Sequence, residues 1–254
     1  MHTTDSHIDV TVILTTYNEE HLLRMGKHEQ VRRALEASPW SWEILFIDDA
    51  SRDGSAAVLE QFVAGDPRLC LLRNEKNLGR GGTVARALRE ARGRVAGFLD
   101  LDCSIRPDVL PDFVDPILRG DIDAATACRH YRIGKSRDAA HIAKRWVFTM
   151  GYRAVSSMLL PLPAVDTPSG CKFFNREKIL PILDSVKNQR WFWQTELLLR
   201  AARAGLRVRE IHVPYYRDSA TGTTVTPLRD IMEYIDSIAR VRRELRREKQ
   251  RFSN

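Results

Sequence analysis

Short apolar segments rich in β-branched residues alternate with longer amphipathic segments over the first hundred residues of the chain. The apolar segments are predicted to be buried strands and span residues 10–14, 43–47, 69–72 and 94–99. The segments between them have helical spacing and span residues 22–37, 54–63 (with Ser55 as the expected N-cap) and 82–91. Such alternation forms right-handed β-α-β units, so we predict an α/β fold with a mostly parallel sheet flanked by helices.

The alternation becomes less regular beyond residue 103. We expect strands at 123–127 and 208–213, and helices at 139–160, 178–183, 191–204 and 227–247. Gly205 follows one of these helices and is expected to end it. No internal repeat or low-complexity linker divides the sequence, so we predict a single domain over residues 1–254.

Composition narrows the class of protein. With 43% hydrophobic and 29% charged residues, the chain has the balance of a folded globular protein. Its cysteines, Cys70, Cys103, Cys128 and Cys171, form no CxxC pair, so the sequence indicates neither a zinc site nor a disulfide framework. A reducing, cytoplasmic compartment is the simplest expectation.

The net charge of +7 is unevenly distributed, and residues 240–251 form a strongly basic run. This run fits contact with anionic lipid headgroups, and it fits equally a solvated helix with i,i+4 charge pairs. The first nine residues are polar, and the apolar stretch at 146–165 is interrupted by Arg153 and two prolines. We therefore expect a cytoplasmic protein that is soluble or peripheral at the inner face of the membrane.

Polar side chains cluster where three of the predicted strands end. Tyr17 and Glu19 follow the first strand, Asp48 and Asp49 the second, and Asp100 with Asp102 the fourth. Ligands of open α/β sheets bind beyond the carboxyl ends of the strands. Carboxylates gathered there repel one another unless a cation or a donor-rich ligand joins them, so we expect a binding site at this edge.

Asp100 and Asp102 are the predicted metal ligands. An Asp-x-Asp pair at a strand end places two carboxylates on the same side of the chain. Hard oxygen ligands suit Mg²⁺ or Mn²⁺, whose coordination is commonly completed by water and substrate phosphates. An Asp-x-Asp sequence also occurs at ordinary solvated strand ends, and only its position among the other acids favours the metal.

Two neighbouring motifs have both a functional and a structural interpretation. Asp48 and Asp49 fit hydrogen bonding to a nucleobase or ribose, and they fit capping of the helix that follows. The glycine-rich segment 77–82 fits a phosphate contact through Arg80, although it lacks the spacing of a P-loop or dinucleotide fingerprint. It fits a helix-entry turn as well.

The ordered set of motifs resembles the inverting family 2 glycosyltransferases. These motifs are TTYNE at 15–19, DDASRDGS at 48–55, NLGRG at 77–81 and DLDCS at 100–104. In the second half, DTPSGCKFF at 166–174 and RWFWQTELL at 190–198 resemble the polyprenyl-phosphate (dolichyl-phosphate) glucosyl- and mannosyltransferases. The resemblance covers residues 10 to about 240 and implies the GT-A nucleotide-diphospho-sugar transferase fold, with a Rossmann-like sheet.

The resemblance also implies roles for particular residues. The residues expected to surround the base and ribose are Thr15, Tyr17, Glu19, Asp48 and Asp49. Asp100 and Asp102 are expected to contact the diphosphate and the metal. Arg129 and Arg145 are expected to contact the phosphates, and Ser169, Gly170 and Lys172 to lie near the sugar and the acceptor. A helix that carries Trp191 and Glu196 is expected to close the site. Residues 8–104 would then be the nucleotide-sugar half, 105–226 the acceptor half and 227–254 a basic C-terminal helix. Of these residues, Asp102, Arg129, Arg145 and Glu196 are the predicted catalytic set.

The chain departs from the family pattern at several positions. Ser104 stands where many mannosyltransferases have Gln, which favours a glucosyl-type member. Thr15 replaces a common Pro, and Cys171 replaces Phe or Tyr. A Gly-Ser-Lys sequence that often follows the last strand is Gly-Thr-Thr at 222–224, which weakens the expected acceptor-phosphate contact. The transmembrane segments of several relatives have no counterpart in this sequence.

The expected reaction is transfer of a hexose from a UDP- or GDP-sugar to a polyprenyl phosphate. A phosphate oxygen is already anionic near neutral pH, so positioning and charge neutralisation would suffice without a general base. A soluble or cell-envelope hydroxyl acceptor would need a base, with Glu196 and Asp166 as candidates. Glu196 fits equally a buried helix carboxylate paired with an Arg.

A non-catalytic nucleotide-binding or nucleic-acid-associated protein is the alternative from another class. The acidic strand ends would repel a phosphate backbone, and the basic residues form a terminal run rather than a groove interleaved with aromatic residues. We therefore predict no nucleic-acid partner.

Overall fold

The apolar segments of the first hundred residues form parallel neighbouring strands, as predicted. In the computed structural model, which describes residues 7–131, 150–190, 192–216 and 233–244, they are β1 (Val10–Thr16), β2 (Trp42–Asp48), β3 (Leu69–Arg73) and β4 (Val95–Leu99). β1 pairs in parallel with β2 and β4, and β2 with β3. Every residue of β2 and β4 is buried, which explains why each is a nearly continuous apolar run.

The helices between these strands differ from the predicted ones in two details. The helix expected at 22–37 is divided into α1 (Glu20–Arg24) and α2 (His28–Glu36) at Gly26, whose φ of 68° is a left-handed value that glycine adopts without strain. The next helices are α3 (Ser55–Val63) and α4 (Gly79–Glu90). Gly54, not Ser55, is the N-cap of α3. The Ser55 hydroxyl instead donates to Asp53 and accepts from the backbone N–H of Glu19, so it joins α3 to the end of β1.

Within the described residues, the second half contains the expected elements and others that the sequence did not predict. The expected helical residues 139–149, 227–232 and 245–247 lie outside the described residues. The helices are η1 (Pro107–Val109), α5 (Leu110–Leu118), α7 (Arg176–Leu183) and α8 (Trp193–Arg203), with further helical segments at 150–159 and 233–244. The strands are β5 (Ala124–Tyr131), β6 (Cys171–Asn175) and β7 (Val208–Tyr215). α5 and β6 were not predicted. β7 continues through Pro214, which is tolerated because β7 is an edge strand.

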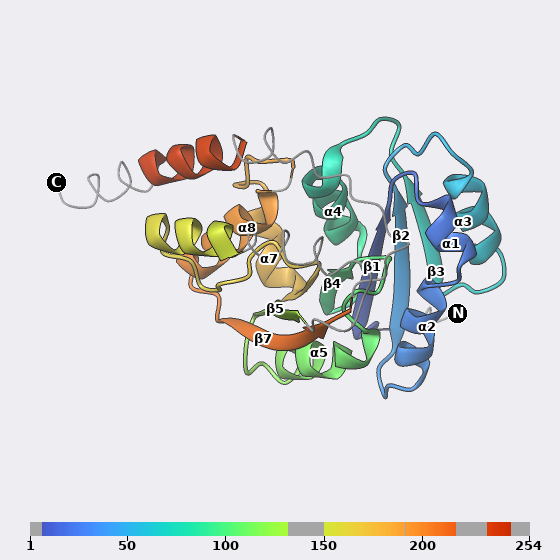
Figure 1. Cartoon of the computed structure of the whole chain (residues 1–254). Helices are drawn as coiled ribbons and strands as arrows, with labels where there is room; N and C mark the ends of the chain where they lie inside the picture. The colour runs from blue at the N-terminus through green and yellow to red at the C-terminus, as the bar shows by residue number, and fades with distance from the viewer. Residues whose placement is uncertain (1–6, 132–149, 191, 217–232, 245–254) are drawn as a thin grey trace.

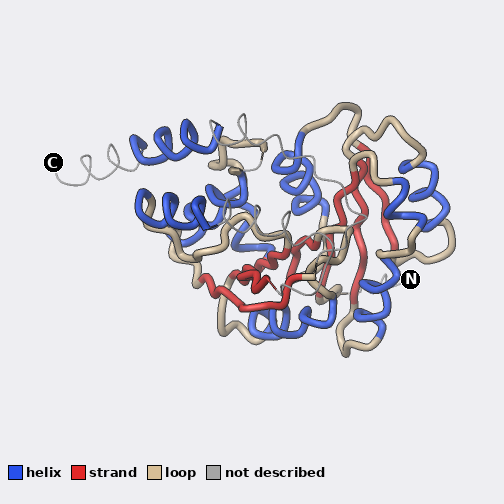
Figure 2. The backbone as a smooth tube through the Cα atoms, viewed as in Figure 1, coloured by secondary structure: helices blue, strands red, loops and turns tan. Residues whose placement is uncertain are grey.

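All these strands belong to one sheet with the order β3-β2-β1-β4-β6-β5-β7. Figure 2 draws the strands in red. β6 runs antiparallel to both β4 and β5, whereas β7 is parallel to β5. The sheet is therefore continuous across residue 104, the predicted boundary between the two halves, and the mostly parallel α/β architecture is confirmed.

Helices cover both faces of the sheet, with α1, α2 and α3 on one side and α4 on the other (Figure 1). The first face packs against residues of α1, α2, α3 and α5, including Leu23, Leu35, Leu59 and Phe113. The opposite face packs against α4, α7 and α8. Trp193 belongs to this second cluster and Phe192 to a smaller one with the helix at 233–244, so both aromatic side chains lie in the core. None of the helices in the described residues combines the length and apolar character needed to cross a bilayer.

Candidate active site

Three carboxylates meet beyond the carboxyl ends of β1 and β4. Burial, followed by the negative charge of Asp100, raises the pKa of Glu19 to about 8. Burial and Asp100 likewise raise the pKa of Asp102. Among the described residues, Glu19 Oε2 is buried and has no hydrogen-bond partner. The side chains that the sequence placed at separate strand ends are thus close enough to repel one another electrostatically.

Arg80 and Gly170 hold Asp100 in this cluster. The guanidinium of Arg80, from the first turn of α4, forms an ion pair with the Asp100 carboxylate. The Asp100 N–H donates to the Gly170 carbonyl at 2.9 Å. A Cβ at Gly170 would lie only 1.7 Å from Asp100 Oδ2, so glycine is required for the carboxylate to occupy this position.

Ser104 fixes the orientation of Asp102. Its N–H donates to Asp102 Oδ1 at 2.9 Å, and its hydroxyl donates to Oδ2 at 2.7 Å. Cys103, between them, has a φ of 51° and so turns the chain sharply enough for these contacts. Ser104 therefore has a structural role, which is to hold the Asp102 carboxylate.

The carboxylates fit a hard divalent cation. In the described part of the chain, no group of three or more His, Cys, Asp or Glu side chains is arranged to hold a metal by itself. Asp100 and Asp102 would therefore supply two ligands and leave positions for water or substrate phosphate, as Mg²⁺ and Mn²⁺ sites commonly do. The unpartnered buried oxygen of Glu19 is consistent with a positive charge next to this cluster.

Asp48 and Asp49 are buried and engaged with the protein. Asp48 accepts from the Ser51 N–H at 3.3 Å. Asp49 accepts from the N–H groups of Leu78 and Gly79 at 2.8 and 3.0 Å, and from the Asn74 amide at 2.7 Å. Asp49 thus stabilises the start of α4 rather than the start of the helix that follows it in sequence. Nucleotide contacts by this pair remain predictions.

The glycine-rich segment is a helix-entry turn packed against another loop. The Gly81 and Gly82 N–H groups donate to the Gln189 carbonyl at 2.9 and 3.4 Å. A Cβ at Gly81 would lie 2.6 Å from the Trp193 side chain, which explains that glycine by close packing. Because Asp49 and Gln189 already accept from four N–H groups of this segment, the Arg80 side chain is its candidate contact with an anion.

A second charged cluster surrounds Asp166, which is fully buried. Burial alone would raise its pKa, but hydrogen bonds from Arg129 and the charges of Arg129 and Arg153 lower it to about 2. Arg129 Nε and a terminal nitrogen each lie 2.8 Å from a carboxylate oxygen, and Arg153 lies 2.6 Å from Asp166 Oδ2. A carboxyl group with so low a pKa is unsuited to be a general base.

Ser169 and Lys172 are also buried, immediately beside Gly170. The Lys172 amine donates to Ser169 Oγ at 3.1 Å, to the Ser169 carbonyl at 2.5 Å and to Gln194 Oε1 at 2.8 Å. Burial lowers its pKa to about 7, and the charges that act on it include Asp166, Arg129 and Arg80. These residues therefore join the Asp100 cluster to the Asp166 cluster, and the Lys172 amine itself is bound to protein acceptors.

Glu196 is fully buried in α8 and accepts from the backbone and from arginine side chains. Its oxygens accept from the N–H groups of Lys187 and Asn188 at 3.1 and 3.0 Å, and from Arg200 Nε at 2.9 Å. Arg240 contributes a further contact at 3.4 Å. This environment matches the buried, arginine-paired carboxylate that the sequence left open as the alternative to a catalytic base.

The remaining predicted site residues are placed as follows. Thr15 is partly buried in β1, and Tyr17 is 40% exposed beyond the strand's end. Arg145 and Trp191 lie outside the described residues. The sequence did not single out Arg153, Gln189 or Gln194, whose contacts link segments far apart in the chain. Of these three residues, only Arg153 stood out in the sequence, because it is a charged residue within an apolar stretch.

A comparison with protein families decides the identity of the fold and site. Residues 11–183 match the model of glycosyl transferase family 2. The chain belongs to that family. The predicted family resemblance and the GT-A fold are therefore confirmed.

Two family 2 relatives match over most of this chain. Glycosyltransferase AglD of Haloferax volcanii is 30% identical over 230 residues, which are 90% of this chain and 36% of that protein. A dolichyl-phosphate beta-glucosyltransferase of Dictyostelium discoideum is 24% identical over 245 residues, 93% of this chain and 74% of that protein. The chain thus spans about a third of the archaeal relative and three quarters of the other.

Solved structures share the fold of this family 2 chain at low identity. Glucosyl-3-phosphoglycerate synthase of Mycobacterium tuberculosis, in complex with Mn²⁺, UDP-glucose and phosphoglyceric acid, has a TM-score of 0.60 at 19% identity, covering 91% of this chain and 77% of that one. The mannosyltransferase PcManGT of Pyrobaculum calidifontis, in complex with GDP-Man and Mn²⁺, has a TM-score of 0.54 at 20% identity, covering 85% and 59%.

Proposed function

We propose that this family 2 protein is a metal-dependent, inverting hexosyltransferase that uses a UDP- or GDP-linked sugar and a polyprenyl-phosphate acceptor. The observation that carries the proposal is the meeting of Glu19, Asp100 and Asp102 at the carboxyl edge of β1 and β4, with Arg80 bound to Asp100. This arrangement suits a diphosphate with a divalent cation better than it suits either alone.

Asp100 and Asp102 are proposed to hold Mg²⁺ or Mn²⁺, with Arg80 available to the departing diphosphate. When bound, the cation would neutralise charge that develops on the nucleoside diphosphate. Complexes of the two solved relatives contain Mn²⁺ together with a nucleotide sugar, which supports divalent metal use without choosing between the ions. Thr15, Tyr17, Asp48 and Asp49 are proposed to surround the base and ribose.

In the proposed reaction, an acceptor oxygen attacks the anomeric carbon from the side opposite the diphosphate. The new carbon–oxygen bond forms as the bond from that carbon to the diphosphate oxygen breaks, and the nucleoside diphosphate leaves with the bonding electron pair. The anomeric configuration inverts because a single displacement occurs. A phosphate acceptor brings its own negative charge and needs no proton removed.

The second charged cluster supports a phosphate acceptor over a hydroxyl. Arg129 and Arg153 place two guanidinium groups at Asp166, and guanidinium groups pair strongly with phosphate. The Glu210 carboxylate also lies here and accepts from the Asp166 N–H at 2.6 Å. The two candidate bases are both engaged: Asp166 has a pKa of about 2, and Glu196 is buried among donors. The relative from D. discoideum is named for a dolichyl-phosphate substrate and for glucose, which agrees with Ser104 in favouring a glucosyl-type enzyme.

Nucleotide binding is tested first by calorimetric titration of UDP and GDP, with and without Mn²⁺. We expect Mn²⁺-dependent binding of one nucleotide that is lost in Asp102→Asn and kept in Asp108→Asn, a matched change at an exposed position. Absence of nucleotide binding by the folded wild type would overturn the donor-site assignment.

The acceptor is tested by sugar transfer from UDP-glucose and GDP-mannose. A short-chain polyprenyl phosphate, the corresponding free polyprenol and phosphoglycerate are compared as acceptors. Transfer to the polyprenyl phosphate alone supports the proposal, and transfer to either of the others supports the hydroxyl-acceptor alternative. Sedimentation with anionic vesicles tests the proposed peripheral location at the cytoplasmic face of the membrane.

A further inference from the structure

The loop at 187–190 connects the donor-site arginine to the interior of α8. Its residue Gln189 accepts, through the backbone carbonyl, from the N–H groups of Gly81 and Gly82 at 2.9 and 3.4 Å. Gly81 directly follows Arg80, whose side chain binds Asp100. The loop therefore fixes the backbone of the turn from which the Arg80 side chain projects.

Glu196 fixes the opposite side of this loop. Its two carboxylate oxygens accept separately from the consecutive N–H groups of Lys187 and Asn188, at 3.1 and 3.0 Å. A carboxylate that receives two adjacent backbone donors fixes the orientation of both peptide groups. Because Glu196 is fully buried, water does not readily replace it in these contacts.

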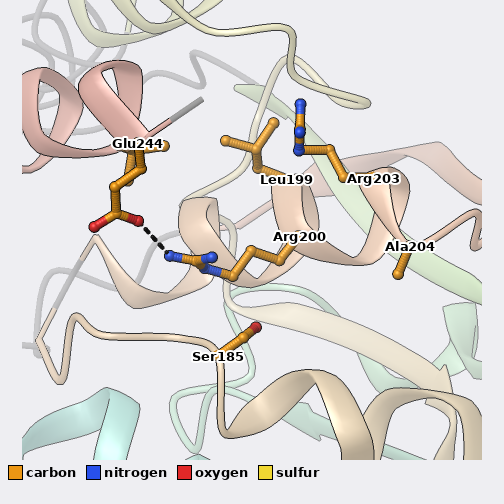
Figure 3. A pocket seen from close by; sticks show the side chains of 7 residues that line it. Ser185, Leu199, Arg200, Arg203, Ala204 and Glu244 are labelled. Atoms are coloured by element: carbon orange, nitrogen blue, oxygen red, sulfur yellow. Dashed lines mark hydrogen bonds and ion pairs between the residues drawn. The ribbon is translucent and has the colours of Figure 1, made fainter. Parts of the chain in front are cut away.

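The same carboxylate also joins the loop to the segment at 233–244. Arg240 lies 3.4 Å from Glu196 Oε2, and the Asn188 amide donates to Ser237 Oγ at 3.2 Å. Arg200 lies between Glu196 and Glu244, with a contact of 3.0 Å to the latter (Figure 3). The cavity in this view has a volume of about 270 Å³ and is lined by none of the predicted donor-site residues.

We propose that Glu196 is a positioning residue for the donor site, acting through the Gln189 carbonyl on the backbone that places Arg80 against Asp100. The inference rests on the proposed nucleotide-sugar function, because Arg80 matters in it as a contact of the donor diphosphate. It differs from the catalytic role expected from the sequence, since the contacts of Glu196 within the described residues are with loop N–H groups and with arginine side chains.

The test compares Glu196→Gln with the wild type in two measurements. The amide group keeps the size of the side chain but presents an N–H₂ to one of the loop N–H donors, so one of the paired contacts is lost. We expect faster hydrogen exchange at residues 79–82 in the nucleotide-free protein. We also expect Mn²⁺-dependent nucleotide affinity to fall about tenfold, the loss typical of residues that orient a ligand-binding group.

A double-mutant cycle separates positioning from general destabilisation. If Glu196 acts through Arg80, Glu196→Gln should weaken nucleotide binding much less in an Arg80→Gln background than in the wild type. Equal losses in both backgrounds would overturn the inference. Glu177→Gln is the matched control, because Glu177 is an exposed side chain in the first turn of α7, and it should leave both measurements unchanged.

A milder variant keeps the test valid if Glu196→Gln does not fold. Arg240→Gln removes one contact of Glu196 from a 37% exposed side chain and should change exchange and affinity in the same direction by a smaller factor. Unchanged exchange at 79–82 in both variants would overturn the inference while leaving the proposed function in place. Failure of the wild type to bind any nucleotide would overturn the proposed function and with it the role of Glu196.

Discussion

The Gly170 carbonyl accepts the backbone N–H of Asp100, and the Gly170 Cα faces the Asp100 carboxylate so closely that no side chain fits between them. The hydrogen bond is 2.9 Å long, and a Cβ at Gly170 would lie 1.7 Å from Asp100 Oδ2. The position of a proposed metal ligand is thus set by a residue 70 positions away in the chain. The glycine of the Ser-Gly-Cys-Lys motif is explained by this contact.

Gly170→Ala should abolish donor binding with little loss of the fold. The added methyl group must displace the Asp100 carboxylate, and misplacement by about 1 Å commonly costs about 100-fold in activity. We expect a loss of at least about that size in kcat/KM for sugar transfer. Gly151→Ala is the control, because a Cβ there meets nothing within 4 Å. Equal transfer rates in Gly170→Ala and the wild type would contradict the proposed role of Asp100.

Asp166 should contribute to stability at neutral pH and lose this contribution in acid. Its folded-state pKa is about 2, below the value of about 3.9 in an unfolded chain, so the unfolded state takes up the proton first as pH falls. The contribution is complete above about pH 5 and declines towards pH 2, by about 2 kcal/mol in all.

Asp166→Asn tests this contribution. The change leaves Arg129 and Arg153 buried without their anion and should cost roughly 3–5 kcal/mol at pH 7. Urea unfolding from pH 7 to pH 3 should show that the difference between wild type and variant narrows as the pH falls. Asp184→Asn, at an 80% exposed side chain, serves as the control. A difference that stays constant with pH would exclude the proposed ionisation of Asp166.

Lys172 should make stability depend on pH in a more alkaline range than Asp166 does. Burial lowers its pKa to about 7, below the value of about 10.4 in an unfolded chain, so the unfolded state binds the proton more tightly. Through this group, stability rises as pH increases from about 7 towards 10. The free energy of unfolding of the wild type, measured against Lys172→Met, should therefore increase by about 2 kcal/mol between pH 7 and 9.

The comparison is made by urea unfolding at each pH, with the exposed Lys76→Met as control. The control should show no such trend. If the difference in the free energy of unfolding between the wild type and Lys172→Met stays constant over this range, the amine is charged throughout. Its hydrogen bonds to Ser169 and Gln194 alone would then compensate for its burial.

The predictable parts of the fold were those encoded by local patterns. β1, β2 and β4 are buried apolar runs, so their positions could be predicted from the sequence. The rule that ligands bind at the carboxyl ends of parallel strands then predicted that Glu19, Asp100 and Asp102 lie at one edge of the sheet. β6 was missed because it contains Lys172, a charged residue that is not expected in a mostly buried strand. Its amine donates there to neutral acceptors on Ser169 and Gln194. α5 was missed because prolines at 111 and 116 obscure its periodicity.

The partners of the predicted site residues were less accessible to sequence reasoning. Asp49 was correctly seen as a possible cap, but the helix it caps is α4, 30 residues away from it at Gly79. The sequence around Glu196 fits a carboxylate that faces a substrate and one that is paired with an arginine equally well. Only the tertiary structure places Lys187, Asn188 and Arg200 around it. Long-range pairing of this kind leaves no mark on local hydrophobic spacing.

The antiparallel insertion of β6 between β4 and β5 also determines the order in which the site can be assembled during synthesis. When residues 8–104 have emerged from a ribosome, β4 is an open edge, and the Asp100 N–H lacks the acceptor that Gly170 later provides. Only a nascent chain that extends through Asn175 can close that edge. The acidic cluster therefore reaches its final geometry late, after most of the nucleotide-sugar half is able to fold.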